Sequence, residues 1–226
     1  MYDQMLDKVN HYIKYPQLKP YIGENYSNTR LKLLVVGESH YLSKKTNYHH
    51  DPVEWYKGID ISDDMDDAGI KTRNIIIKWM NNECKRKSRV IYRNIEKALF
   101  DSDFFKGKPD NAFSEIAFMN FFQRPAEING KSIIVSDIDL TESNKIFSEV
   151  VNIIQPDSVI FTSSLAYKAA KKGGTLNQLK ARNITFTRTP HPGTSWWNRI
   201  SKAYSNKTGK LHFIEFINAQ VRFQDE

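Results

Sequence analysis

The chain has 226 residues, of which 40% are apolar and 26% charged, and its formal net charge is +7. This composition can bury a substantial core, and the length fits a single domain because α/β domains often exceed 200 residues. No run approaches the roughly 18 to 20 uncharged apolar residues of a membrane span, and the single cysteine, Cys84, excludes an intramolecular disulfide and a cysteine metal cluster. The start of the sequence lacks the basic and apolar regions of a signal peptide, so we expect a cytoplasmic protein without a membrane partner.

The first third of the chain predicts a helix, a buried strand and a long loop. Residues 1–15 have apolar side chains at helical spacing, and Pro16 and Pro20 end that helix. Residues 31–36 are almost continuously aliphatic, which is typical of a parallel strand buried on both faces. A polar loop then extends from Glu38 to about Ala68, and loops of this length are usually functional or disordered.

The middle of the chain predicts two helices, a second strand and a third helix. Residues 70–81 and 90–100 have helical spacing, and residues 113–122 are rich in apolar and aromatic side chains and end in polar ones. An amphipathic helix follows, with Thr141 as its expected capping residue, and Pro156 with Asp157 closes it.

The last third predicts a strand at 158–162, a helix at 163–172, a strand at 183–187 and a terminal helix at 211–221. Strands that alternate with helices indicate a parallel sheet with helices on both faces. We therefore expect an α/β protein, a three-layer αβα sandwich around a central, mostly parallel four-stranded sheet. Residues 1–226 form a single domain in this interpretation, with an N-terminal helical extension at residues 1–30.

The positive charge is concentrated in one stretch. Residues 158–214 contain no Asp or Glu. The cations in that stretch are Lys168, Lys171, Lys172, Lys180, Arg182, Arg188, Arg199, Lys202, Lys207 and Lys210. Such a stretch should present a positive potential to a phosphate backbone, so nucleic acid, DNA above all, is the expected partner. We predict no obligatory protein partner.

Two polar loops follow predicted strands and indicate a pocket. Residues 37–41 read Gly-Glu-Ser-His-Tyr after the first strand, and residues 190–195 read Pro-His-Pro-Gly-Thr-Ser after the last. Ligands of open α/β sheets bind outside the carboxyl ends of the strands, so the two loops are expected to face one site.

These motifs, with residues 118–120 (Phe-Met-Asn) and 159–164 (Val-Ile-Phe-Thr-Ser-Ser) between them, resemble those of the uracil-DNA glycosylase superfamily in their order along the chain. The resemblance covers approximately residues 31–219 and implies that family's fold. It also implies that residues 37–41 match a water-activating loop whose tyrosine, here Tyr41, shapes the base pocket. Asn120 would read the pyrimidine edge, and His191 would stabilise the departing base anion.

The sequence departs from the family pattern at Ser39, because the most active families have an aspartate there. In an enzyme, Glu38 or a water bound by Ser39 would then supply the nucleophile. The expected catalytic residues are Glu38, Ser39 and His191, and the expected base pocket consists of Gly37, His40, Tyr41 and Asn120. The aromatic residue that stacks on the base is left open among Trp55, Tyr56 and His40.

The chain after Pro192 would match the loop that enters the minor groove and helps to expel the nucleotide. Trp196 and Trp197 stand there beside cations, a combination that suits stacking on bases and contact with phosphates. Adjacent side chains point apart, so we expect at most one tryptophan to reach nucleic acid and the other to pack in the core. The predicted nucleic-acid contacts are Ser164, Lys168, Arg188, Ser195, Trp196, Trp197, Arg199 and Lys202.

Three other interpretations compete with this one. The first is a catalytically silent nucleic-acid-binding protein of the same fold. The second is a serine hydrolase, because Gly37-Glu38-Ser39 partly matches a nucleophile elbow, and Asp157 and His191 follow in the order of a triad. The third is a metal site at His40, His49, His50 and Asp51 with the acidic residues at 60–67; its spacing fits neither a zinc nor a calcium motif, so we predict no metal and no cofactor.

Overall fold

The computed structural model describes residues 1–42, 46–59, 69–81, 90–107 and 109–225. Its centre is a sheet with the strand order β1-β3-β2-β4-β5. Four strands are parallel, namely β2 (Leu33–Gly37), β3 (Ala117–Asn120), β4 (Ser158–Phe161) and β5 (Thr185–Arg188). The fifth, β1 (Tyr21–Ile22), pairs antiparallel with β3 at one edge.

The predicted four-stranded sheet is thus corrected to five strands. The four parallel strands lie where the apolar runs indicate them, with ends that differ by up to four residues. The additional strand β1 has only two residues, which is too short to show the alternation of apolar and polar residues that predicts a strand.

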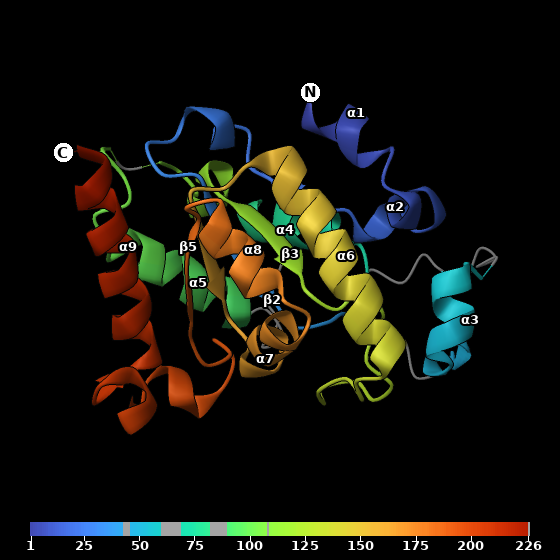
Figure 1. The fold of residues 1–226 in the computed structure, drawn as a ribbon. Coiled ribbons are helices and arrows are strands. Elements are labelled where there is room, and N and C mark those ends of the chain that lie inside the picture. Colours follow the sequence, from blue (N-terminus) through green and yellow to red (C-terminus); the bar gives the residue numbers. More distant parts are fainter. Residues whose placement is uncertain (43–45, 60–68, 82–89, 108, 226) are drawn as a thin grey trace.

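Helices cover both faces of this sheet, which makes three layers (Figure 1). On one face lie α6 (Asp137–Ile154), α7 (Ser164–Lys172) and α8 (Thr175–Ala181). The other face packs against α4 (Thr72–Met80), α5 (Val90–Phe100) and α9 (Gly209–Asp225).

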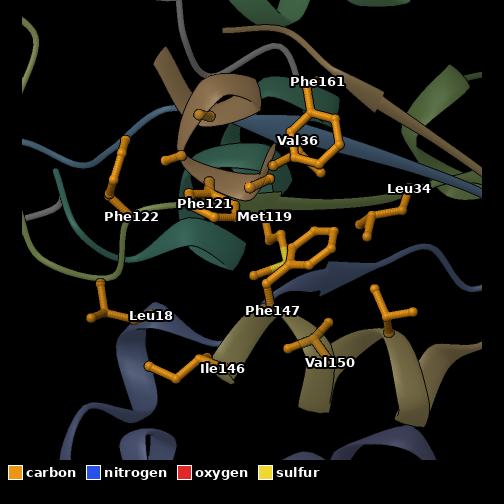
Figure 2. Close-up of a cluster of buried hydrophobic side chains, with 14 of the residues drawn as sticks. Leu18, Leu34, Val36, Met119, Phe121, Phe122, Ile146, Phe147, Val150 and Phe161 are labelled. Atoms are coloured by element: carbon orange, nitrogen blue, oxygen red, sulfur yellow. The ribbon is translucent and has the colours of Figure 1, made fainter. Parts of the chain in front are cut away.

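Each face of the sheet has its own core because strand side chains alternate. Leu34 and Val36 of β2 point towards α6, where Phe147 and Val150 meet them (Figure 2). Leu33 and Val35 belong to the core on the opposite face, with α4, α5 and α9. Every residue of β2 is buried, which explains the continuous aliphatic run of a strand covered on both sides.

The N-terminal segment is part of the domain core and not only a helical extension. The predicted helix at 1–15 is two short helices, α1 (Tyr2–Leu6) and α2 (Asn10–Lys14), and it is followed by β1. Leu6 and Tyr12 are buried in the same core as α6.

Several boundaries differ from the sequence prediction. The helix α6 begins before Thr141, because Ser136 and Asp139 form a reciprocal capping box at its start. The long loop after β2 contains the 3-10 turn η3 (Tyr48–His50) and α3 (Pro52–Lys57). The remaining short elements are η1 (Pro16–Leu18), η2 (Tyr26–Asn28), η6 (Ala112–Glu115), η7 (Ser195–Trp197), β6 (Ile200–Ser201), η8 (Lys202–Tyr204) and β7 (Lys207–Thr208).

Candidate active site

The carboxyl ends of the four parallel strands carry the polar residues from which a site can be built. Gly37 ends β2 and pairs in register with Asn120, which ends β3. Pairing continues beyond the strands, since the Phe122 amide donates to the carbonyl of Glu38 at 2.9 Å. The histidine loop follows β5 at the same edge of the sheet, because β5 is parallel to β4.

Asn120 lies directly against Gly37. A Cβ atom at position 37 would be only 2.2 Å from Asn120 Oδ1 and 3.2 Å from the ring of Phe118. Glycine therefore lets the amide of Asn120 rest on the backbone of β2. A side-chain amide held in this way offers one hydrogen-bond donor group and one acceptor to a ligand.

Glu38 is partly exposed and is held by the start of α7. The Ser163 hydroxyl donates to Glu38 Oε2 at 2.6 Å. Ser163 is the N-cap of α7, and its oxygen accepts the backbone N–H of Ala166 at 3.2 Å. The carboxylate is therefore fixed beside a helix N-terminus, where the helix dipole favours negative charge.

His191 is partly buried in a loop held by α5. Asn94 of α5 donates to the carbonyl of Pro192 at 2.7 Å, and the Gly193 amide donates to His191 Nδ1 at 3.1 Å. Because Nδ1 accepts a hydrogen bond, the hydrogen of the neutral ring is on Nε2. Burial lowers the pKa of His191, so the ring is neutral at pH 7. The negative charge of Glu38 acts in the opposite direction and raises this pKa, which places the carboxylate near the ring.

The other residues of the 37–41 loop differ in their surroundings. Tyr41 is half-buried, and burial followed by the charge of Glu38 raises its pKa, so it is a protonated phenol beside the carboxylate. Ser39 Oγ is buried and lacks a hydrogen-bond partner among the described residues.

His40 supports the loop from inside. It is only 3% exposed, its Nε2 lies 2.8 Å from Thr72 Oγ1 of α4, and burial lowers its pKa to about 4. Such a side chain has almost no surface to present to a base. The other two stacking candidates are also buried, since Trp55 stacks on Tyr15 and the Tyr56 hydroxyl lies 3.3 Å from Ser143 Oγ.

Asp157 cannot be the acid of a serine hydrolase triad, because it lies at the opposite edge of the sheet from His191. Asp157 precedes β4, and its carboxylate accepts the backbone N–H of Lys32, which precedes β2. His191 follows the carboxyl end of β5. The three residues cannot form a triad.

Within the described part of the chain, no three metal-binding side chains come together. Asp51 caps α3 by accepting the amides of Val53 and Glu54, and His49 is buried beside the exposed His50. The acidic residues at 60–67 lie outside the described residues.

The predicted nucleic-acid contacts lie on α7, at the end of β5 and in the segment after the histidine loop. Ser164 opens α7, and Arg188 at the end of β5 lies over the ring of Tyr167, 5.5 Å from its centroid. No ion pair is found among the described residues for Lys168, Arg188, Arg199 or Lys202. Three other cations of the acid-free stretch have acidic partners outside it, Lys172 with Asp137, Lys207 with Glu215 and Lys210 with Asp101.

The two tryptophans divide as expected. Trp196 is 54% exposed, whereas Trp197 is 1% exposed and packs edge-on against Phe213 of α9. Trp197 is therefore a core residue and is removed from the candidate contacts. Ile200, in the short strand that follows, is also largely exposed.

The sequence analysis does not include Ser163 among the site residues, although two serines at the start of a predicted helix are typical of an N-cap.

In the part of the chain that the structure describes, no helix is both long and apolar enough to cross a membrane. A scan of protein-family models finds none that matches this chain, and a search of curated proteins finds no significant match.

Proposed function

We propose that this chain is a divergent member of the uracil-DNA glycosylase superfamily, which binds nucleic acid and hydrolyses the N-glycosidic bond of a flipped uracil or damaged base. The observation that carries the proposal is that an amide, a carboxylate and a neutral imidazole all stand at or just after the carboxyl ends of neighbouring parallel strands. Asn120, Glu38 and His191 supply these groups.

Each group has a separate task in this reaction. Enzymes that act on a base must take it out of the stack, and the Asn120 amide can bind the edge of the extruded base. As the bond between C1′ and the base nitrogen breaks, its electron pair moves onto the base. The Nε2–H of His191 donates a hydrogen bond to the anion that develops there, which is an effective form of electrostatic catalysis in a partly buried site.

Water completes the reaction with the help of Glu38. The water oxygen bonds to C1′ while the carboxylate takes one of its protons and later releases it to solvent, and the departing base takes up a proton from solvent. The products are a free base and a sugar with a hydroxyl at C1′. Glu38 thus takes the place of the aspartate that the family pattern has at position 39.

The nucleic-acid partner is supported by the surface around the histidine loop. Arg188 precedes His191 by three residues, and Arg199 and Lys202 follow it on the segment that exposes Trp196. These three cations have no acidic partner among the described residues and can contact phosphates, whereas Lys207 and Lys210 are already paired. We expect binding to weaken steeply with added salt, because each phosphate contact releases counterions.

The test is release of free base from a labelled oligonucleotide that contains uracil, offered single-stranded and as a duplex. Wild type should release base, and His191→Ala should lower the rate about 10²- to 10³-fold by removing one donor to the developing anion. His50→Ala, which changes an exposed histidine on η3, is the matched control and should keep the wild-type rate.

Two results would contradict the proposal. Salt-sensitive binding without release from uracil or damaged-base substrates would favour the catalytically silent binder of the same fold. Binding that does not respond to salt would remove nucleic acid as the partner.

A further inference from the structure

Glu38 and the two groups with which it would act lie on different sides of the sheet. Glu38 follows Val36 by two residues and therefore continues the face that packs against α6 and α7. Asn120 follows Phe118 by two residues and continues the opposite face, where α5 holds the histidine loop through Asn94. For the carboxylate to act with them, it must be held at the edge of the sheet.

Ser163 is placed to do this. It is 1% exposed, so its hydroxyl is fixed by the protein and not by solvent. Its oxygen accepts the Ala166 amide at 3.2 Å, and this leaves its single hydrogen for Glu38 Oε2 at 2.6 Å. Bonds to an ionised acceptor are short and roughly twice as strong as those between neutral groups.

We propose that Ser163 is a positioning residue, which holds the Glu38 carboxylate at the carboxyl edge of the sheet, beside His191. This inference rests on the proposed function. Ser163 itself touches neither substrate nor water in the reaction; it acts through Glu38. Without its hydrogen bond, the flexible glutamate side chain is free to turn into solvent, and a displacement of about 1 Å can lower a rate about 100-fold.

Three substitutions separate this role from helix capping. Ser163→Thr keeps the hydroxyl donor and the cap. Ser163→Asp keeps an acceptor for the Ala166 amide but cannot donate to Glu38 and repels it. Ser163→Ala loses both bonds. Ser136→Ala, at the N-cap of α6, is the control for cap loss without Glu38.

The kinetic expectation is a fall in kcat with little change in KM. Both Ser163→Asp and Ser163→Ala should lower kcat for base release about 100-fold after correction for the folded fraction. Ser163→Thr should restore kcat to within a few-fold of wild type, and Ser136→Ala should affect only stability. Wild-type kcat in Ser163→Asp would overturn the inference, and this variant keeps the test valid if Ser163→Ala does not fold.

A second readout does not depend on activity. Because the Glu38 charge raises the pKa of His191, NMR titration of the His191 ring reports where the carboxylate lies. Glu38→Gln and Ser163→Ala should both lower that pKa, and Ser163→Thr should leave it unchanged. A shift in Glu38→Gln but none in Ser163→Ala would overturn the positioning role, whereas absence of base release by wild type would overturn only the proposed function.

Discussion

Two polar regions of this protein differ in how completely their hydrogen-bonding groups are paired. In the first, which we call the Arg124 cluster, the side chain of Arg124 is fully buried and all its N–H groups have acceptors. The acceptors are both carboxylate oxygens of Asp139, Glu127 Oε1 and the carbonyls of His49 and Ile134, at 2.6 to 2.9 Å. This cluster joins η3, the loop after β3 and the start of α6.

The second region is the carboxyl edge of the sheet, where several buried polar atoms have no partner among the described residues. These atoms are Ser39 Oγ, His40 Nδ1, Gln123 Oε1 and Thr189 Oγ1. A buried polar group left unpaired costs about 1–3 kcal/mol. Other such atoms lie elsewhere among the described residues, on His11, Tyr12, Tyr26 and His49. The guanidinium of Arg124 thus makes all its hydrogen bonds within the protein, whereas the atoms at the carboxyl edge are left to bind water or a ligand.

The largest expected effect comes from opening the Arg124 cluster. Arg124→Met removes the cation and leaves Asp139 buried without its partner, which should lower the free energy of unfolding by about 3–5 kcal/mol. Denaturant unfolding measures this change. Arg182→Met is the control, because Arg182 is exposed and bonds to Asn152, and it should change stability by less than about 0.5 kcal/mol. A loss below about 1 kcal/mol for Arg124→Met would show that the cluster is not a structural centre.

Adding a side chain at Gly37, which lies against Asn120, should lower the rate of base release more than the stability of the fold. The new Cβ of Gly37→Ala would lie 2.2 Å from Asn120 Oδ1, so the amide must move, and we expect kcat/KM for base release to fall about 100-fold. Gly107→Ala is the matched control, because a Cβ there meets nothing within 4 Å. Wild-type base release by Gly37→Ala would mean that the position of Asn120 does not matter.

The ring of His40 is buried in its uncharged form, so its protonation in acid should lower the free energy of unfolding. The folded pKa is about 4 and the ordinary value is 6.5, so between these values the unfolded chain binds a proton that the folded chain does not. Stability is therefore lost as pH falls below 6.5. At pH 5 the loss from this one ring should be about 2 kcal/mol relative to pH 7.

His40→Gln removes that titration while its amide can still reach Thr72, so denaturant unfolding at the two pH values should show a smaller difference for this variant. His11 and His49 contribute in the same direction, because burial lowers their pKa values to about 3 and about 4. Equal pH dependence in wild type and His40→Gln would contradict the buried neutral ring.

The sequence predicts the parallel strands well because a strand buried on both faces must be apolar throughout, as β2 is. It does not reveal β1, because two residues cannot show alternation, or α8, which Gly174 separates from α7 by a left-handed turn. Its prediction of Thr141 as a cap is wrong because the capping pair is Ser136 with Asp139, one turn earlier.

The candidate site is predictable to the extent that parallel strands end at one edge, which brings Gly37 and Asn120 together. The same rule excludes Asp157, because a residue that precedes a parallel strand lies at the opposite edge. Charge in the 158–214 stretch is harder to predict, since Lys210 is neutralised by Asp101, more than a hundred residues away in sequence. The spacing of residues along the chain does not predict such a contact.

The smallest expected effect separates two neighbouring tryptophans, one exposed and one buried. Trp196→Ala removes an exposed ring, so stability should stay within about 0.5 kcal/mol, but binding to single-stranded oligonucleotide should weaken about 10-fold because one stacking surface is lost. Trp197→Ala is the reciprocal control: it leaves a cavity beside Phe213 and should lower the free energy of unfolding by about 3–5 kcal/mol. Fluorescence anisotropy and denaturant unfolding of both variants measure the two quantities. If Trp196→Ala binds as wild type does, the exposed ring is not a nucleic-acid contact, and the open side of the site must recognise its ligand through the cations alone.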